Sequence, residues 1–212
     1  MEVTFEGPAG ILQGYLLLPD RDGTLPGVVV CHPHPLMGGD LHNNVVVGIC
    51  HQLAHLGIAS LSFNFRGVGR SQGTYDNGIG ELTDAAAALD WLQAENPTAR
   101  TTWIAGFSFG AWLALQLLMR RPEISGFVAI SPPASLYDFS FLAPCPSNGL
   151  IIQGTEDKIV EEECVTELVE KLNKQKNLKI EYRKIPGADH FFAKSLDDIQ
   201  NKIEKYISKN TN

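Results

Sequence analysis

The chain has 212 residues, of which 44% are hydrophobic and 19% are charged, enough to bury a substantial core in one domain. Seventeen basic and twenty-four acidic residues give a net charge of −7, which argues against nucleic acid or an acidic membrane surface as a partner. Four widely spaced cysteines, no run of the roughly 20 apolar residues that span a membrane, and no signal-peptide pattern at the start predict a soluble, cytoplasmic protein.

The predicted elements start with a β-hairpin, because two strand-like runs at residues 2–6 and 11–18 flank a Gly-Pro-Ala-Gly turn. From residue 27 on, apolar strand-like runs alternate with helix-like runs. Strands are expected over residues 28–31, 58–65, 101–106, 126–130, 149–153 and 178–185, and helices over residues 44–56, 81–95, 111–120, 161–175 and 195–208. This alternation predicts an α/β fold, with a mostly parallel sheet covered by helices on both faces. We expect one domain over residues 1–208 and a disordered tail over residues 209–212.

The most informative motif is Gly106-Phe107-Ser108-Phe109-Gly110, which lies between a predicted strand and a predicted helix. A serine between two glycines at such a turn is lifted out of the sheet, with its hydroxyl at the positive end of the helix. The turn is so tight that only residues without a Cβ fit at positions 106 and 110. The motif therefore predicts a nucleophile elbow with Ser108 as the nucleophile; the alternative is a small structural residue in a tight turn.

A nucleophilic serine needs a general base, and the base needs an acid that orients it. His190 follows the last predicted strand, and Asp157 lies three residues beyond the glycine that ends the strand before it. The chain order Ser108, Asp157, His190 is expected of one hydrolase fold and differs from the order in the two familiar serine protease folds. Glu156 competes with Asp157 for the acid role and Asp189 is a weaker rival, while the alternative for His190 is a surface loop histidine.

These residues resemble those of the α/β-hydrolases, in particular the small cap-less esterases and the dienelactone-hydrolase-like members. The resemblance runs from about residue 27 to residue 192 and includes His-Pro-His-Pro-Leu-Met-Gly-Gly at 32–39 and Asn-Phe-Arg-Gly-Val-Gly-Arg-Ser at 64–71. It implies an α/β-hydrolase fold. Dienelactone hydrolases use a cysteine where this chain has Ser108, which argues against that activity. Residues 131–148, between the sixth and seventh strands, are too few for a cap domain, so we expect an open site that suits small esters.

The reaction expected of such a site passes through an acyl-enzyme, with His190 as base and Asp157 holding its imidazole. Two N–H groups must stabilise the oxyanion, and the first is that of Phe109, the residue after the nucleophile. The second comes from the loop after Cys31. Pro33 and Pro35 have no N–H, so His34 is the best candidate, with Leu36 and Met37 next. Five side chains are expected to line the substrate pocket: Leu36, Phe107, Leu136, Tyr137 and Phe191.

The sequence thus predicts a serine hydrolase that cleaves ester bonds of small substrates. A peptidase or an acyltransferase could use the same triad, although a peptidase of this fold usually carries an additional substrate-gating domain. A catalytically silent binding protein is the alternative outside enzymes. The natural substrate and the oligomeric state stay open.

Histidines could suggest a metal site, because His32 and His34 form one pair and His51 and His55 another on a predicted helix. No acidic residue has recognisable ligand spacing, so we expect neither a metal nor a cofactor. His32 is expected to pack beneath the oxyanion loop. For Arg66 we expect a role in anchoring its own loop.

Overall fold

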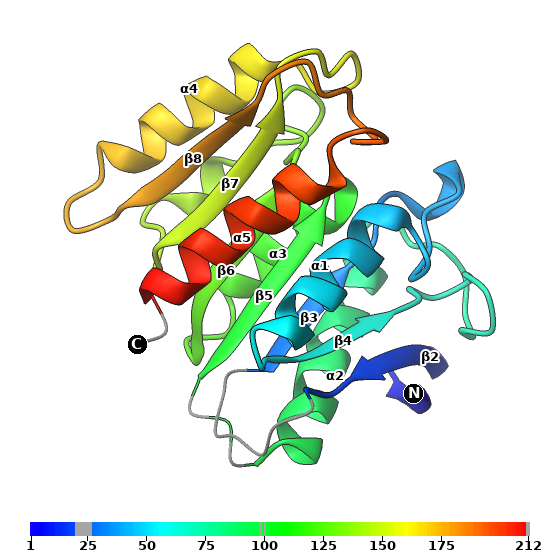
Figure 1. Cartoon of the computed structure of the whole chain (residues 1–212). Coiled ribbons are helices and arrows are strands. Elements are labelled where there is room, and N and C mark those ends of the chain that lie inside the picture. Colours follow the sequence, from blue (N-terminus) through cyan, green and yellow to red (C-terminus); the bar gives the residue numbers. More distant parts are fainter. Residues whose placement is uncertain (20–26, 98, 100, 211–212) are drawn as a thin grey trace.

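The computed structural model describes residues 1–19, 27–97, 99 and 101–210 (Figure 1). A single sheet runs through the described part, with its strands in the order β1-β2-β4-β3-β5-β6-β7-β8. The strands are β1 (Glu2–Gly7), β2 (Gly10–Leu17), β3 (Gly27–Cys31), β4 (Ala59–Phe63), β5 (Thr102–Phe107), β6 (Ile124–Ile130), β7 (Gly149–Gly154) and β8 (Ile180–Ile185). β1 and β2 form the predicted hairpin and β2 pairs antiparallel with β4, while all other neighbours are parallel. The predicted α/β fold with a mostly parallel sheet is confirmed.

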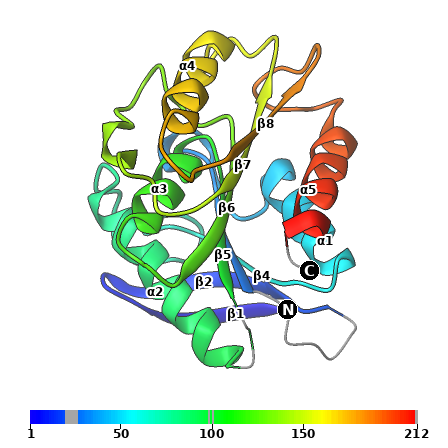
Figure 2. The ribbon, with the colours of Figure 1, turned by 90° about the vertical axis from the view of Figure 1, so that its left-hand side faces the viewer.

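Five α-helices cover this sheet within the described residues: α1 (Asn44–His55), α2 (Ile79–Glu95), α3 (Phe109–Leu118), α4 (Glu162–Asn173) and α5 (Leu196–Asn210). Figure 2 looks along the sheet and shows α1 and α5 on one face and α2, α3 and α4 on the other. Two buried apolar clusters correspond to these two faces. Because successive side chains of a strand point to opposite faces, Val28 and Val30 of β3 join one cluster, and Val29 and Cys31 join the other.

The end of the last helix differs from the prediction. Lys209 and Asn210, which we expect in a disordered tail, belong to the final turn of α5. The Asn210 side chain donates a hydrogen bond to the carbonyl oxygen of Tyr206, whose ring is buried beneath the helix. This contact satisfies one of the carbonyl groups that a helix end leaves open, so for these two residues the tail prediction is wrong. Thr211 and Asn212 lie outside the described residues.

The order in which strands are added to the sheet reverses at β3: β4 lies on one side of β3, and β5 and the later strands lie on the other. Ligands of open α/β sheets bind outside the carboxyl ends of the strands at such a switch point. Here these ends are Cys31 of β3 and Phe107 of β5, and Cys31 pairs with Gly106, the residue before Phe107. The loop that starts at His32 and the turn that holds Ser108 therefore meet at this edge.

Residues 131–148 connect β6 to β7, and the structure describes all of them. They contain one short 3₁₀ helix, η2 (Ser140–Leu142), and no α-helix. The edge above Ser108 is therefore not covered by a helical cap, as predicted. In the described part of the chain, no helix has the length and apolar character needed to cross a membrane.

Candidate active site

Ser108 occupies the predicted tight turn between β5 and α3. Its backbone adopts φ 53° and ψ −121°, and its N–H donates to the carbonyl oxygen of Ile130 at 2.8 Å. A Cβ at Gly106 would collide with the backbone of Gly110, and a Cβ at Gly110 would collide with the carbonyl oxygens of Cys31 and His32. Both glycines are therefore required for close backbone packing, which confirms the prediction that no Cβ fits at these positions.

A chain of hydrogen bonds joins the three residues that the sequence singled out. Ser108 Oγ lies 3.1 Å from His190 Nε2, and His190 Nδ1 lies 2.7 Å from Asp157 Oδ2. An ionised carboxylate can only accept, so Nδ1 carries the proton and Nε2 accepts from the serine hydroxyl. The three residues follow β5, β7 and β8, whose carboxyl ends lie at the same edge of the sheet.

Asp157 is held by more than the imidazole. Its Oδ1 accepts from the backbone N–H groups of Ile159 at 2.9 Å and Val160 at 2.8 Å. Burial by itself raises the pKa of this carboxyl, but the hydrogen bonds from His190, Val160 and Ile159 outweigh burial and hold the pKa below its ordinary value. The carboxylate is therefore charged at neutral pH and can fix the tautomer of His190.

The competing carboxylates lie elsewhere. Glu156 is exposed, and Asp189, also exposed, accepts from the N–H of Phe191 at 3.1 Å within its own loop. Of the three acidic residues considered, only Asp157 is hydrogen-bonded to the His190 ring.

Sequence reasoning missed Gln153, a fully buried residue near the end of β7. Its Nε2 donates to Asp157 Oδ2 at 3.1 Å and to the carbonyl oxygen of Val160 at 2.9 Å. The side chain thus ties the carboxylate to the loop that carries it. A polar residue within an otherwise apolar strand, directly before the glycine that ends it, was the available signal.

His32 lies beneath the loop that follows β3, as expected. It is fully buried, its Nδ1–H donates to the carbonyl oxygen of Pro33 at 2.6 Å, and its Nε2 accepts from the N–H of Phe65 at 3.1 Å. Burial lowers the pKa of His32 to about 4. His32 is therefore neutral at pH 7 and connects two loops at the edge of the sheet.

His34 belongs to the same loop but faces the site. Its Nδ1 accepts from the N–H of Leu36 at 3.2 Å, which leaves the proton on Nε2, 3.2 Å from the hydroxyl oxygen of Tyr75. The imidazole ring lies 4.8 Å from the ring of Phe109. The described residues contain no group of three or more His, Cys, Asp or Glu side chains placed to hold a metal ion.

Backbone N–H groups distinguish the candidate oxyanion donors. The N–H of Leu36 donates to the His34 side chain, and that of Met37 donates to the His34 carbonyl oxygen at 3.0 Å. The N–H groups of His34 and Phe109 have no acceptor among the described residues. Gly110 packs against the backbone of the loop that carries His34, and His34, Ser108 and Phe109 line the same cavity.

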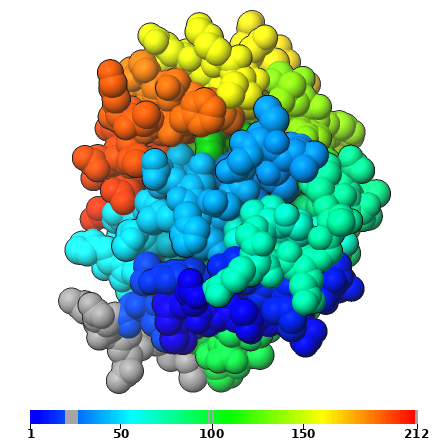
Figure 3. All heavy atoms as spheres, turned by 90° about the vertical axis from the view of Figure 1, so that its right-hand side faces the viewer, coloured from blue at the N-terminus to red at the C-terminus, as the bar shows by residue number. Residues whose placement is uncertain are grey.

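These residues line an open cavity of about 500 Å³. In Figure 3 a hollow with a green floor lies between the light-blue segment near residue 36 and the orange segment near residue 190. All five predicted pocket residues lie along this cavity with Ser108 and His190: Leu36, Phe107, Leu136, Tyr137 and Phe191. The sequence analysis did not anticipate Asn43, the N-cap of α1, or Ile159, two residues after Asp157.

The mouth of this cavity is unusually apolar. Nine large hydrophobic side chains are exposed among the described residues, and five of them line this one cavity, with exposed fractions between 45% and 84%: Leu36, Met37, Leu136, Ile159 and Phe191. Exposed apolar side chains that gather at one place mark a binding surface. His190 and His34 are the only titratable side chains besides Tyr137 that the described lining contains.

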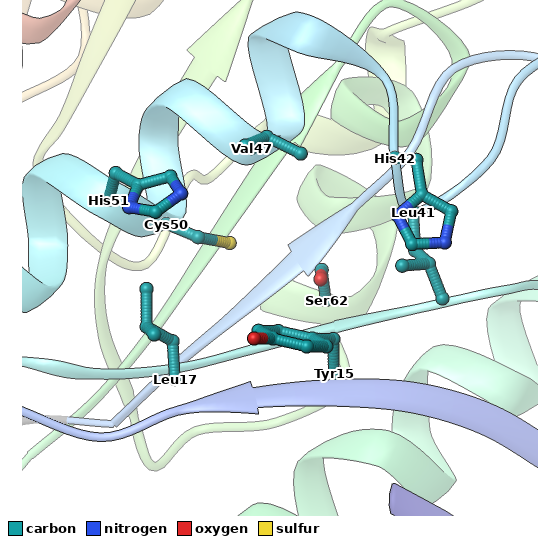
Figure 4. A pocket seen from close by; sticks show the side chains of 8 residues that line it. All are labelled: Tyr15, Leu17, Leu41, His42, Val47, Cys50, His51 and Ser62. Carbon is teal, nitrogen blue, oxygen red and sulfur yellow. The ribbon is translucent and has the colours of Figure 1, made fainter. Parts of the chain in front are cut away.

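A different cavity of about 260 Å³ lies between α1 and the β2–β4 edge of the sheet. Figure 4 shows Cys50 and Ser62 pointing into it from opposite sides. Burial raises the pKa of Cys50 to about 11, so its thiol is protonated at neutral pH and is a poor nucleophile. No histidine is hydrogen-bonded to Cys50 among the described residues, in contrast to Ser108.

The fold and two similar solved structures define the class of the protein. A protein of unknown function from Agrobacterium tumefaciens, ATU1826, described as a candidate α/β hydrolase, superimposes with a TM-score of 0.94 at 49% identity, covering 99% of this chain and 96% of that one. XC6422 from Xanthomonas campestris, described as an α/β serine hydrolase without a lid, has a TM-score of 0.90 at 36% identity and covers 100% of this chain and 94% of its own. The chain is an α/β serine hydrolase without a cap.

Sequence comparison narrows this class to a family. The model of the X-Pro dipeptidyl-peptidase (S15) family matches residues 12–148, and the chain belongs to this family. The match includes Ser108 and the loop of His34 but ends before Asp157 and His190. The uncharacterized protein RP471 of Rickettsia prowazekii is 49% identical over 210 residues, covering 97% of this chain and 88% of the relative.

Proposed function

We propose that this protein hydrolyses ester bonds of small, uncharged substrates through an acyl-enzyme on Ser108. The observation that carries the proposal is the hydrogen-bonded chain from Ser108 through His190 to Asp157 at the floor of an open, apolar cavity. Such a chain activates a serine hydroxyl at neutral pH.

In this reaction the Ser108 oxygen attacks the ester carbonyl while His190 Nε2 takes the hydroxyl proton. Asp157 stabilises the imidazolium that forms, through its contact with Nδ1. The N–H groups of Phe109 and His34 donate to the oxygen that becomes negatively charged. The imidazolium then gives its proton to the leaving alcohol. Water, deprotonated by His190, attacks the acyl-enzyme and releases the acid.

The lining of the cavity favours an ester over an X-Pro dipeptide. A dipeptidyl-peptidase must accommodate the charged amino terminus of its substrate, and a buried ammonium group needs a partner of opposite charge. No Asp or Glu side chain belongs to the described lining of the cavity. An uncharged ester carries no such requirement, and its apolar groups fit the exposed side chains at the mouth.

X-Pro dipeptidyl-peptidase activity is the second candidate, because the family model that matches residues 12–148 bears that description. The two candidates share the serine nucleophile and differ in the leaving group. They can therefore be compared with chromogenic substrates on the same preparation of enzyme.

The deciding experiment measures release of p-nitrophenol from p-nitrophenyl acetate through decanoate, and of p-nitroaniline from Ala-Pro-p-nitroanilide. We expect turnover of the esters, little turnover of the anilide, and no turnover of either by Ser108→Ala. Preferred cleavage of the dipeptide anilide would replace the proposal with the peptidase. A wild-type protein that turns over neither and is not labelled by a fluorophosphonate probe would be a silent binding protein.

A further inference from the structure

Another cavity, here named the second cavity, shares a lining residue with the cavity of Ser108 and is distinct from the one between α1 and the sheet. It has a volume of about 490 Å³ and lies between residues 134–143 and α4. Its floor contains four buried apolar side chains: Phe139, Leu142, Leu168 and Leu172. Charged and polar side chains of α4 and the residues after it, Glu167, Lys171 and Gln175, form its rim.

Tyr137 borders both cavities. Pro133 and Leu136, its neighbours in the chain, line the cavity of Ser108, whereas Ala134 and Asp138 line the second cavity. The segment from 133 to 138 is thus the partition between the two spaces. Among the described residues, Tyr137 is the one that lines both cavities.

The ring of Tyr137 is held in this partition by aromatic contacts. It stacks on Trp112 with 4.4 Å between ring centroids and meets Phe109 edge-on at 6.1 Å. Trp112 Nε1 also donates to the carbonyl oxygen of Asp138 at 3.3 Å, which fixes the chain on the far side of the ring. The hydrogen bond of Trp112 to Asp138 does not involve the Tyr137 ring, so it can persist when the ring is removed.

The second cavity is bounded at its other end as well. Gln175 accepts from the N–H of Cys145 at 2.7 Å and donates to the carbonyl oxygen of Leu142 at 2.8 Å. These bonds attach residues 142–145 to the chain just beyond α4. The space behind Tyr137 therefore has walls on each side that do not depend on the Tyr137 ring.

We propose that Tyr137 limits the length of one hydrocarbon arm of the ester, and that the second cavity is an extension of the substrate site that this ring closes off. The inference rests on the proposed ester hydrolysis and adds the substrate class: esters with short aliphatic arms for the wild type, and long ones once the ring is gone. The buried leucines and Phe139 provide the apolar surface that a longer chain needs.

The test compares kcat/KM for p-nitrophenyl decanoate and butyrate in the wild type and in Tyr137→Ala. Burial of one more methylene changes an equilibrium by about fourfold, so two methylenes suffice for more than about tenfold. We expect the decanoate-to-butyrate ratio to rise by at least about tenfold in Tyr137→Ala. A series of alkyl acetates, read by acetate release, applies the same comparison to the alcohol arm. If the ratio of long-chain to short-chain kcat/KM rises in neither series, the inference is wrong.

Two matched variants separate the second cavity from a merely larger site. Tyr137→Phe keeps the ring and should keep the wild-type ratio. Tyr137→Ala combined with Cys164→Trp places a large side chain on α4 inside the second cavity. This double variant should return to the wild-type preference; a gain that persists in it would show that long chains do not use the second cavity.

The inference can be wrong while the proposed function is right, and the proposed function can be wrong by itself. If the wild type hydrolyses esters and Tyr137→Ala has an unchanged ratio, only the inference is wrong. If the wild type hydrolyses no ester, the proposed function is wrong, and the rates of labelling by ethyl and decyl fluorophosphonates test the partition directly. A decyl-to-ethyl labelling ratio equal in wild type and Tyr137→Ala would then reject the inference as well.

Discussion

At the scale of single residues, the site depends on a carboxylate whose charge is held by its own loop. Asp157 accepts from two backbone N–H groups, from Gln153 and from His190, so all its partners stabilise the ionised form. His190 can then present Nε2 to Ser108 in the tautomer that accepts a proton. Removal of the Ser108 hydroxyl leaves the hydrogen bond between His190 and Asp157 intact.

Ser108→Ala should abolish ester hydrolysis and leave the melting temperature within about 2 °C of the wild type, since the surface-facing hydroxyl contributes a single hydrogen bond. Steady-state kinetics and calorimetry on the same samples check both parts. A large drop in the melting temperature would indicate that Ser108 is structural.

Gln153→Met removes the hydrogen bond to Asp157 Oδ2 while it preserves the size of the side chain. We expect kcat to fall by about threefold to tenfold with KM unchanged, because a hydrogen bond to a charged carboxylate is worth about 1.5–3 kcal/mol and only part of it acts on the positioning of His190. Gln93→Met, a change in a partly buried glutamine on α2 far from the site, is the control. A change in KM would contradict the positioning role. An equal fall in kcat in both variants would contradict it too.

The buried His32 makes stability depend on pH. Its pKa is about 4 in the folded chain, below the ordinary value of 6.5, so between these values the unfolded chain binds a proton that the folded chain does not. The contribution of His32 to the free energy of unfolding is therefore fully present above about pH 6.5. It is lost as the pH falls towards 4, by about 3 kcal/mol in total. The lowered pKa of His34 acts in the same direction.

Urea unfolding at pH 7 and pH 4.5 tests this dependence. The wild type should lose stability between the two, and His32→Gln should show a markedly smaller loss, although it starts from a lower stability at pH 7. An equal loss of unfolding free energy between the two pH values in both proteins would show that His32 does not govern the acid sensitivity.

At the scale of elements, the elbow works because α3 starts directly against the loop after β3. Gly110, in the first turn of α3, contacts the carbonyl oxygens of Cys31 and His32. Phe109, whose N–H has no acceptor among the described residues, begins this helix, and His34, whose N–H likewise has none, belongs to that loop. We therefore expect the positions of the candidate oxyanion donors to depend on helix packing as much as on the serine turn.

Gly110→Ala should destabilise the fold by about 1–3 kcal/mol and reduce activity more than tenfold, because a backbone collision must be relieved by moving α3 or the loop. Gly48→Ala is the matched control. Gly48 lies inside α1 with ordinary space around its Cα, and alanine there should add about 0.5–1 kcal/mol through helix propensity without affecting activity. Similar effects of both substitutions would contradict the packing argument.

At the scale of the whole molecule, charge and exposure favour uncharged substrates. The chain carries a net charge of −7, and five exposed apolar side chains surround the candidate site. An anionic substrate would be repelled by the protein as a whole and would find no lysine or arginine in the described lining.

We expect p-nitrophenyl hexanoate to be hydrolysed at least about tenfold faster than the p-nitrophenyl monoester of adipic acid, whose chain is equally long and ends in a carboxylate. The comparison is made as kcat/KM at low and at high salt. Leu136→Lys should reduce the ratio of the two kcat/KM values, because it supplies a positive charge at the mouth of the cavity. Equal rates for the two esters in the wild type would contradict the apolar selectivity.

Much of this architecture could be predicted from local sequence. The glycine-flanked serine, the strand before it and the helix after it form one motif, and the inner strands of the parallel sheet are short apolar runs. The end of α5 shows the limit of such reasoning. Residues 209–212 look like a polar tail, yet the contact of Asn210 with the carbonyl of Tyr206 extends the helix because the Tyr206 ring is anchored in the core.

The sequence by itself determined the α/β fold, the elbow at Ser108 and the chain order of Ser108, Asp157 and His190, because these depend on residue type and on spacing within single elements. Only the tertiary structure decided that Gln153 holds Asp157, that the N–H groups of Leu36 and Met37 are already engaged, and that Tyr137 lines two cavities. Those features arise from contacts between segments far apart in the chain. The packing of such segments sets which groups meet, and no local pattern carries that information.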